Sequence, residues 1–215
     1  MTLPAWLLRV AAEVEPAVEA DWNRWYDGTH LPEIVDCPGF LRGARYVAAV
    51  EGGRFYQALY ELRGAEALES AAFAARRGWD RFRPHLRWTA RLGRRIASAR
   101  NAAAPLSDRA LPLCLLTVEA EIAADAEDEW NAWYDGEHLA RVTACPGFVQ
   151  SARYLHEAED ARRYLALYEI MGPEALRSPQ FALAAPWGRF ETQVEARAFV
   201  HRRIAAREQA GSAVV

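Results

Sequence analysis

The chain of 215 residues contains no lysine, so all 26 of its basic residues are arginines. Its formal net charge is −3, and without an excess of positive charge we expect no nucleic-acid partner. Cysteine is scarce, and the odd count of three (Cys37, Cys114 and Cys145) argues against a disulfide framework. The chain also lacks a charged leader with a long apolar run and any segment of transmembrane length. We therefore expect a soluble, cytoplasmic protein with no membrane contact.

Several catalytic signatures are absent as well. The sequence has no HxxxH, CxxC or HExxH spacing of metal ligands, no glycine-rich phosphate-binding loop and no nucleophile elbow. These absences argue against a metal site, a phosphate-binding loop and a serine hydrolase.

What the sequence does contain is a duplication. The segment Asp21–Tyr46, DWNRWYDGTHLPEIVDCPGFLRGARY, recurs at Glu129–Tyr154 as EWNAWYDGEHLARVTACPGFVQSARY. The offset of 108 residues needs no insertion or deletion, and it extends downstream to the pair Trp79 and Trp187. One unit of about a hundred residues has therefore been duplicated, and the fold must be read twice.

Each repeat predicts the order β-α-β-β-α-β. Pro16 and Glu19 suit the first turn of a helix, and Pro38-Gly39 require that helix to end. In the first repeat we expect strands over 6–14, 40–50, 55–63 and 91–99, helices over 19–35 and 64–75, and a partly helical piece over 79–88. In the second we expect strands over 113–122, 148–157, 163–170 and 196–205, a helix over 126–143 and another from 173.

This order of elements is that of a ferredoxin-like fold. We expect one repeat over residues 1–100, a linker over 101–110, a second repeat over 111–207 and a frayed tail over 208–215. A lone ferredoxin-like unit leaves one face of its sheet bare, and a tandem pair can bury both faces within one chain. The prediction is an α+β fold in which two units pack sheet-to-sheet as an intramolecular barrel. Further homo-oligomerisation is left open.

The motif Trp-Asn-x-Trp-Tyr-Asp-x-x-His-Leu, followed by Cys-Pro-Gly-Phe and Ala-Arg-Tyr, resembles the dimeric α+β barrel superfamily, especially its EthD-like branch. The resemblance covers both repeats and so nearly the whole chain. It implies apolar pockets between sheet and helices. That superfamily includes cofactor-free monooxygenases, polyketide cyclases, decarboxylases and haem enzymes. We expect no cofactor, and a haem with a single histidine ligand stays open as the alternative.

The repeated motif places aromatic and polar side chains on one predicted helix. Residues four apart share a helix face, so Trp22, Tyr26 and His30 form one stripe, whereas Trp25 is expected to point elsewhere. Other motif side chains flank this stripe or repeat it in the second half: Asn23, Asp27, Trp130, Asn131, Tyr134, Asp135 and His138. An aromatic stripe on a helix that covers a sheet is most often plain core, which is the simpler interpretation for the tryptophans.

His30 and His138 are the only histidines retained between the repeats. Each follows an aspartate by three residues, Asp27 or Asp135, which lies within side-chain reach on a helix. Such a carboxylate can orient the ring and raise its basicity, as a general base requires. The alternative is a structural histidine near a helix end beside a surface aspartate. These four residues are the catalytic candidates.

Strand alternation places Arg45 and Tyr46 on opposite faces of the sheet. If Arg45 faces the helices, it meets a substrate carboxylate or enolate, or else it pairs with Asp27 or Glu61 and is structural. The candidate substrate-binding residues are Trp22, Asn23, Tyr26, Arg45, Tyr46, His85, Trp130, Asn131, Tyr134, Arg153 and Tyr154.

The repeats differ just after the retained histidine, where Leu-Pro-Glu follows His30 and Leu-Ala-Arg follows His138. Pro32 restrains the end of the first helix. The first repeat also has His85 where the second has Gln193, in a region that the resemblance places near the pocket mouth. We therefore expect the first repeat to carry the principal site.

The sequence predicts an enzyme that acts on a small hydrophobic molecule, aromatic or polyketide-like, by His-assisted proton transfer, as in a cyclase, dehydratase, decarboxylase or isomerase. A cofactor-free monooxygenase is the nearest alternative, and a non-catalytic ligand-binding or stress-related barrel is the other. A cavity with a His-Asp pair pointing into it favours an enzyme, and a filled interior favours the binding module.

Overall fold

The computed structural model describes residues 2–105, 111–157 and 162–209. Residues 106–110 of the predicted linker and 210–215 of the predicted tail lie outside these ranges. The first repeat comprises β1 (Trp6–Val14), α1 (Glu19–Trp25), η1 (Tyr26–His30), α2 (Leu31–Val35), β2 (Phe40–Val50), β3 (Gly53–Leu62), η2 (Ala65–Glu69), α3 (Ala71–Arg76), η3 (Asp80–His85) and β4 (Leu86–Arg100). The second comprises β5 (Cys114–Ile122), α4 (Glu127–Trp133), η4 (Tyr134–His138), α5 (Leu139–Thr143), β6 (Phe148–Glu157), β7 (Arg162–Ile170), η5 (Pro173–Arg177), α6 (Pro179–Ala184), η6 (Gly188–Phe190) and β8 (Val194–Glu208).

The strands form a single hydrogen-bonded circuit. Their order is β1-β3-β2-β8-β5-β7-β6-β4, and it closes as a barrel. β2 pairs antiparallel with β3 and β8, and β6 pairs antiparallel with β7 and β4. The predicted α+β fold, with two β-α-β-β-α-β repeats and a barrel closed within one chain, is therefore confirmed.

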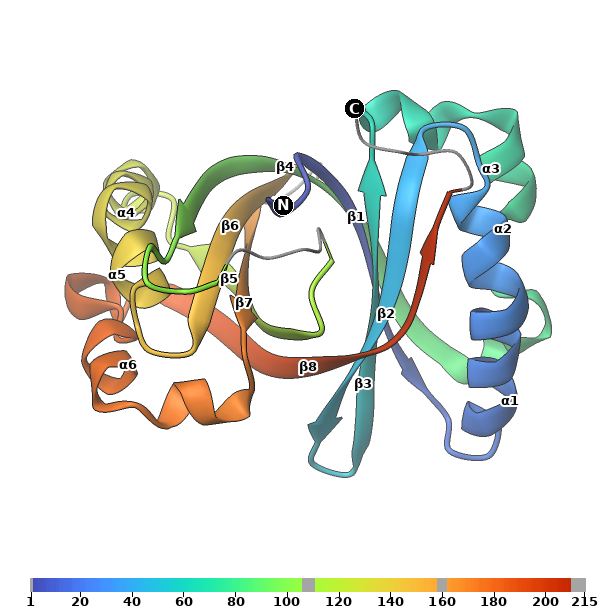
Figure 1. The fold of residues 1–215 in the computed structure, drawn as a ribbon. Coiled ribbons are helices and arrows are strands. Elements are labelled where there is room, and N and C mark those ends of the chain that lie inside the picture. The colour runs from blue at the N-terminus through green and yellow to red at the C-terminus, as the bar shows by residue number, and fades with distance from the viewer. Residues whose placement is uncertain (1, 106–110, 158–161, 210–215) are drawn as a thin grey trace. The chain divides into compact units, whose positions relative to one another are not determined.

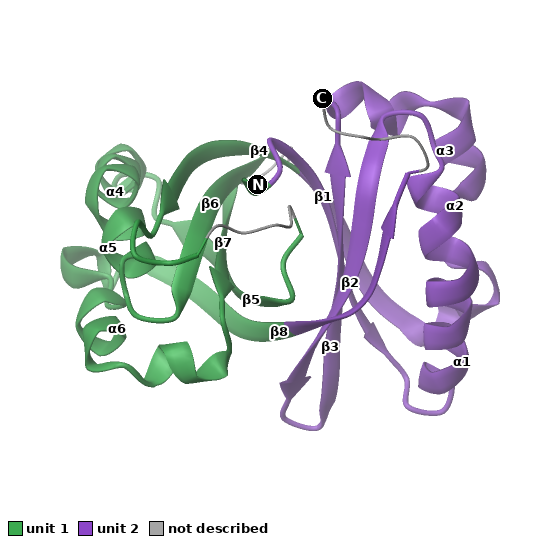
Figure 2. Ribbon diagram, in the orientation of Figure 1, with its two compact units in different colours: residues 1–3, 93–201 green, residues 4–92, 202–215 purple. Residues whose placement is uncertain are grey.

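The compact units of the chain do not coincide with the repeats (Figure 2). Unit 2, in purple, comprises Pro4–Leu92 and Arg202–Val215, and unit 1, in green, comprises Met1–Leu3 and Gly93–His201. β4 and β8 are each divided between the units. The end of β8 pairs with β2 in unit 2, and the end of β4 pairs with β6 in unit 1.

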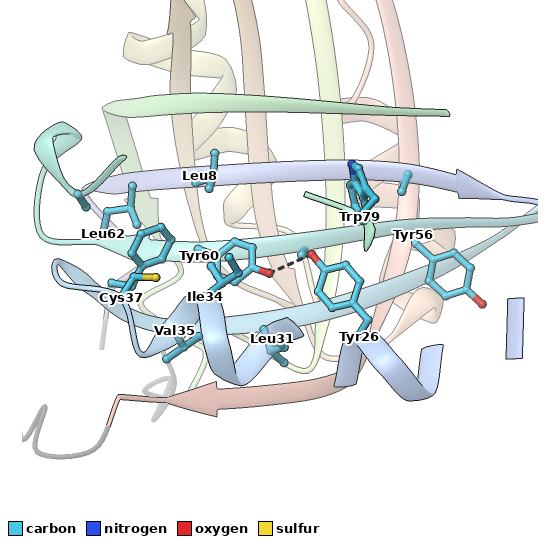
Figure 3. Packing of buried hydrophobic residues seen from close by; sticks show 14 of the residues in the cluster. Leu8, Tyr26, Leu31, Ile34, Val35, Cys37, Tyr56, Tyr60, Leu62 and Trp79 are labelled. Carbon is cyan, nitrogen blue, oxygen red and sulfur yellow. Dashed lines mark hydrogen bonds between the residues drawn. The ribbon is translucent and has the colours of Figure 1, made fainter. Parts of the chain in front are cut away.

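In unit 2, α1 and α2 run along one face of β1, β3 and β2 (Figure 1). The hydrophobic core lies between these helices and the sheet, as Figure 3 shows. It includes Tyr56, Ala58 and Tyr60, which lie two residues apart along β3 and so share one face of the sheet. A corresponding cluster fills the second repeat, built around Trp130, Tyr134 and Tyr168.

The Cys-Pro-Gly-Phe turn fixes how each long helical segment enters the next strand. Gly39 has a φ of +85°, and a Cβ at this position would lie 2.7 Å from the Cβ of Ala67 in η2. Gly147 in the second repeat has a φ of +82°, and its Cβ would lie 2.8 Å from the Cβ of Ala175. Glycine is therefore required twice over, for the backbone conformation and for the close approach.

Several predicted boundaries are wrong for local reasons. The helix predicted over 64–75 is interrupted at Ser70, whose hydroxyl accepts a hydrogen bond from the backbone N–H of Phe73 (3.2 Å) and so caps a new helix. The first residues of the predicted tail are held rather than frayed, because Gln209 donates from its backbone to the carbonyl of Leu41 (3.0 Å). Asn101, the first residue of the predicted linker, is 9% exposed and donates to the carbonyl of Phe148 (3.0 Å).

Among the described helices, none combines the length and apolar character needed to cross a membrane.

Candidate active site

The motif helix is not uniformly α-helical. Between α1 and α2, Tyr26–His30 forms a π-helical turn, in which the backbone N–H of Leu31 donates to the carbonyl of Tyr26. The wider turn aligns residues five apart rather than four. Trp25, predicted to point elsewhere, therefore stacks on His30, with ring centroids 4.7 Å apart and an interplanar angle of 16°. π-Helical turns of this kind are frequent at functional sites.

Gly28 lies in the middle of this π turn. Glycine occurs at this position in both repeats, as Gly28 and Gly136, although it costs about 1 kcal/mol relative to alanine within a helix. A Cβ at Gly28 would have nothing within 4 Å, and the same holds for Gly136. Close approach by another described element is therefore not the reason for glycine here.

His30 is surrounded by aromatic rings. Besides Trp25, the edge of Tyr26 (centroid distance 4.8 Å) and the tilted ring of Trp79 (6.1 Å) contact it. The side chain is 6% exposed, and its ring makes no hydrogen bond to any residue within the described ranges. Burial, and to a smaller extent the positive charge of Arg45, lowers the pKa of His30 from 6.5 to about 4. At neutral pH the ring is therefore an uncharged imidazole.

Asp27 does not orient His30, contrary to the prediction. Its carboxylate pairs with the guanidinium of Arg45, which reaches it from β2. Arg45 is 1% exposed, donates a second hydrogen bond to Oδ1 of Asn23 (2.8 Å), and lies over the rings of Trp22 (4.6 Å) and Tyr26 (4.1 Å). Of the two roles predicted for Arg45, the structure shows the pairing with Asp27.

A phenol pair lies beside the histidine. The hydroxyls of Tyr26 and Tyr60 are 2.9 Å apart and both side chains are buried (Figure 3). Burial raises the pKa of both phenols, that of Tyr60 well above 10, so both stay protonated at neutral pH. One hydroxyl donates to the other, and the pair therefore keeps one O–H that this bond does not use.

His30, Tyr26 and Tyr60 line one pocket of about 600 Å³. The remaining lining residues are Leu8, Val10, Ile34, Leu68, Phe73, Arg77, Gly78, Trp79, Arg83, Trp88, Ala90 and Leu92. All of these residues belong to unit 2. The volume and the apolar lining suit a small aromatic ligand.

Most of the predicted first-repeat ligand contacts lie outside this lining. Trp22 is 1% exposed and packs in the core, as the simpler interpretation had it. Asn23 and Arg45 are hydrogen-bonded to each other, and Arg45 also pairs with Asp27. Tyr46 is buried at the next position of β2. His85 instead pairs with Glu15 (2.7 Å) and lines a separate pocket of about 420 Å³.

The second repeat reproduces the network residue by residue. Arg153 pairs with Asp135 and donates to Asn131 (2.8 Å). It lies over the rings of Trp130 (4.6 Å) and Tyr134 (4.1 Å). Tyr154, like Tyr46, is fully buried at the alternate strand position.

His138 differs from His30 in one respect. Nη2 of Arg141 donates to its Nδ1 (3.3 Å), and Arg141 also lies over Trp133 (5.9 Å). Burial, followed by the charges of Arg141 and Arg153, lowers the pKa of His138 from 6.5 to about 3. The ring of His138 therefore has a protein partner that the ring of His30 lacks in the described part of the chain.

Sequence reasoning missed the residues that shape the pocket. Regular α-helical geometry, with 3.6 residues per turn, predicts that Trp25 points away from His30. Trp79 was used only to show the offset between the repeats. Tyr60 lies in a predicted strand but was not among the candidate site residues. The mid-helix Gly28 was the one signal of an irregular turn, since glycine costs about 1 kcal/mol there.

No group of three or more potential metal ligands occurs among the residues that the structure describes.

The fold of the chain is similar to that of several solved structures. No family model and no curated protein matches the chain. An anthrone oxidase-like protein matches with a TM-score of 0.67 at 13% identity, covering 96% of this chain and 94% of that one. A proposed monooxygenase of Fusobacterium nucleatum matches with a TM-score of 0.62 at 6% identity, covering 95% of this chain and 95% of that one. A proposed monooxygenase of Lactobacillus acidophilus matches with a TM-score of 0.58 at 9% identity, covering 95% of this chain and 97% of that one. Likeness at such identities shows the fold alone, and the EthD-like branch stays a prediction. The chain has the fold of the dimeric α+β barrel superfamily, with both ferredoxin-like repeats in one polypeptide.

Proposed function

We propose that the protein is an enzyme that binds a small aromatic or polyketide-like molecule in the pocket of the first repeat and uses His30 to accept a proton from it. The observation that carries this proposal is the His30 ring itself. It is uncharged at neutral pH, it lines an apolar pocket of about 600 Å³, and it makes no hydrogen bond to the described protein.

The proton transfer follows from the surroundings of the ring. Neutral imidazole takes a proton from an acidic C–H or O–H of the ligand, which leaves an enolate or phenolate beside an imidazolium. In an apolar site these opposite charges attract strongly, so the forming anion raises the proton affinity of a ring that is only weakly basic in the empty pocket. The spare O–H of the Tyr26–Tyr60 pair is a donor for the same anion. Return of the proton to another ligand atom completes an isomerisation or prepares loss of water or carbon dioxide.

The first repeat is the better candidate for this role. His30 keeps both ring nitrogens available, whereas Nδ1 of His138 receives a hydrogen bond from Arg141. Asp27 and Asp135 act as partners of the buried arginines and so hold the helix on the sheet. In this proposal His85 has no part, because it lines a different pocket.

A cofactor-free monooxygenase is the second candidate, favoured by the names of structural neighbours that include an anthrone oxidase-like protein. In that reaction the methylene of an anthrone loses two hydrogens and gains one oxygen atom from O₂, and the other oxygen atom leaves as water. Removal of the first proton from the methylene is the step assigned to His30. We also propose that the protein works without a metal or haem, and in the cytoplasm, where its unpaired cysteines would stay reduced.

The test uses the matched pair His30→Ala and His138→Ala. Native mass spectrometry of the purified protein against aromatic and polyketide-like compounds selects a ligand, and absorbance and an oxygen electrode follow its turnover, with 1,8-dihydroxyanthrone as the first probe. We expect His30→Ala to lower kcat/KM about a hundredfold or more and His138→Ala to leave it nearly unchanged. Full activity of His30→Ala with an intact circular dichroism spectrum would refute the role of His30. Binding of ligands without turnover of any would favour a non-catalytic module. An absorbance band of haem, or stoichiometric zinc by elemental analysis, would refute the cofactor-free proposal.

A further inference from the structure

The two repeats differ sharply along one part of the pocket lining. Most lining positions keep their character at the equivalent place 108 residues later. The exceptions fall within a stretch of twelve residues: Arg77, Gly78, Arg83 and Trp88 correspond to Ala185, Pro186, Glu191 and Ala196. The first repeat therefore has two cations and an indole where the second has none.

The two arginines are available to a ligand. Arg77 follows α3 and Arg83 lies in η3, and both are exposed. Neither guanidinium makes an ion pair or hydrogen bond with the described residues. The intervening Arg81 lies over Phe82 (4.9 Å) and does not line the pocket.

Trp88 extends the apolar wall at the same edge. It is 42% exposed, which is unusual for a tryptophan outside a binding surface, and its ring centroid lies 5.5 Å from that of Trp79. Trp79 in turn contacts His30. An aromatic surface thus runs from the histidine to the part of the pocket that carries the arginines.

We propose that the ligand of this pocket is an aromatic carboxylate, whose ring system lies against Trp79 and Trp88 and whose carboxylate is bound by Arg77 and Arg83. Guanidinium groups match the planar geometry of a carboxylate and can bind it with two parallel hydrogen bonds. This inference rests on the proposed function, because it names the ligand class of the same pocket.

The experiment compares two ligands of equal shape, 1-naphthoate and the neutral 1-naphthamide, by calorimetry and by quenching of tryptophan fluorescence. The test variant is Arg77→Ala/Arg83→Glu, which introduces the residues that the second repeat has at the same positions. Arg24→Ala removes an arginine outside the pocket that pairs with Asp21, and serves as the control for the loss of a surface arginine away from the site.

We expect the wild-type protein and Arg24→Ala to bind naphthoate about tenfold or more tightly than naphthamide, and the double variant to lose that preference while still binding naphthamide. Equal binding of the two ligands by the wild type, or a preference that survives in the double variant, would overturn the carboxylate inference and leave the aromatic pocket standing. Failure of both ligands to bind at millimolar concentration would overturn the inference together with the assignment of the pocket.

Discussion

The two buried histidines predict a measurable loss of stability in mild acid. A histidine in the unfolded chain has a pKa near 6.5, whereas burial lowers the pKa of His30 to about 4 and that of His138 to about 3. Their contribution to stability is complete above pH 6.5 and is lost as the pH falls towards the folded values, because the unfolded chain then binds more protons. Linkage gives a loss of about 2 kcal/mol for each histidine between pH 8 and pH 5. This figure is the same for either folded pKa, since both lie well below pH 5.

Guanidinium denaturation at pH 8 and pH 5, at equal ionic strength, measures this loss. His30→Gln and His138→Gln should each reduce the difference between the two pH values by about 2 kcal/mol, and the double variant by about 4 kcal/mol. His85→Gln is the control, because His85 is partly exposed and pairs with Glu15, and Gln193 occupies the equivalent position. If the double variant loses as much stability between pH 8 and pH 5 as the wild type, burial does not hold the rings of His30 and His138 uncharged.

Three further changes test the packing, each by urea denaturation. Arg45→Met should cost about 1.5–3 kcal/mol, because it removes the hydrogen bonds that the buried guanidinium donates to Asn23 and to the partly exposed Asp27. Arg24→Ala, in an exposed pair, should cost less than about 1 kcal/mol, and the reverse order would contradict the structural role of Arg45. Tyr60→Phe should cost about 1 kcal/mol through the lost hydroxyl pair, and an unchanged midpoint would show that this bond adds nothing. Gly39→Ala should lower the free energy of unfolding by about 1–3 kcal/mol, while Gly28→Ala, with open space around it, should leave it unchanged or raise it. Equal effects of the two substitutions would show that glycine is not specifically required at position 39.

Much of the fold was predictable because the sequence contains two copies of the same unit, so each element could be recognised in both. Wherever turn residues and alternation agreed, the bounds were right, as for β1, β2 and β6. The predicted ends of an element were wrong where that element pairs with a strand far away in the sequence. β8 continues to Glu208 because it pairs with Arg42 of β2, which no local pattern reveals.

The site was predictable in composition but not in geometry. The motif histidine was identified, yet Asp27 had two candidate partners within reach, His30 and Arg45, and its pairing with Arg45 depends on how the helix lies on β2. Trp25 stacks on His30 because of the π-helical turn, and Gly28 was the one residue in the sequence that indicated an irregular turn. Arg77 and Arg83 carry no periodic signal, because exposed charges leave no hydrophobic pattern. Comparison of the two repeats was the signal that could have found them.

The division of β4 and β8 between the compact units has a consequence for synthesis on the ribosome. The sheet around the first-repeat pocket lacks its β8 neighbour until Arg202–Glu208 has been made, more than a hundred residues after β2. Until then the edge of β2 exposes unpaired backbone groups to other nascent chains. The two repeats therefore cannot mature one after the other, and a chain cut at the duplication boundary would leave each half with an open edge. Each compact unit thus contains strand residues from both copies of the duplicated sequence.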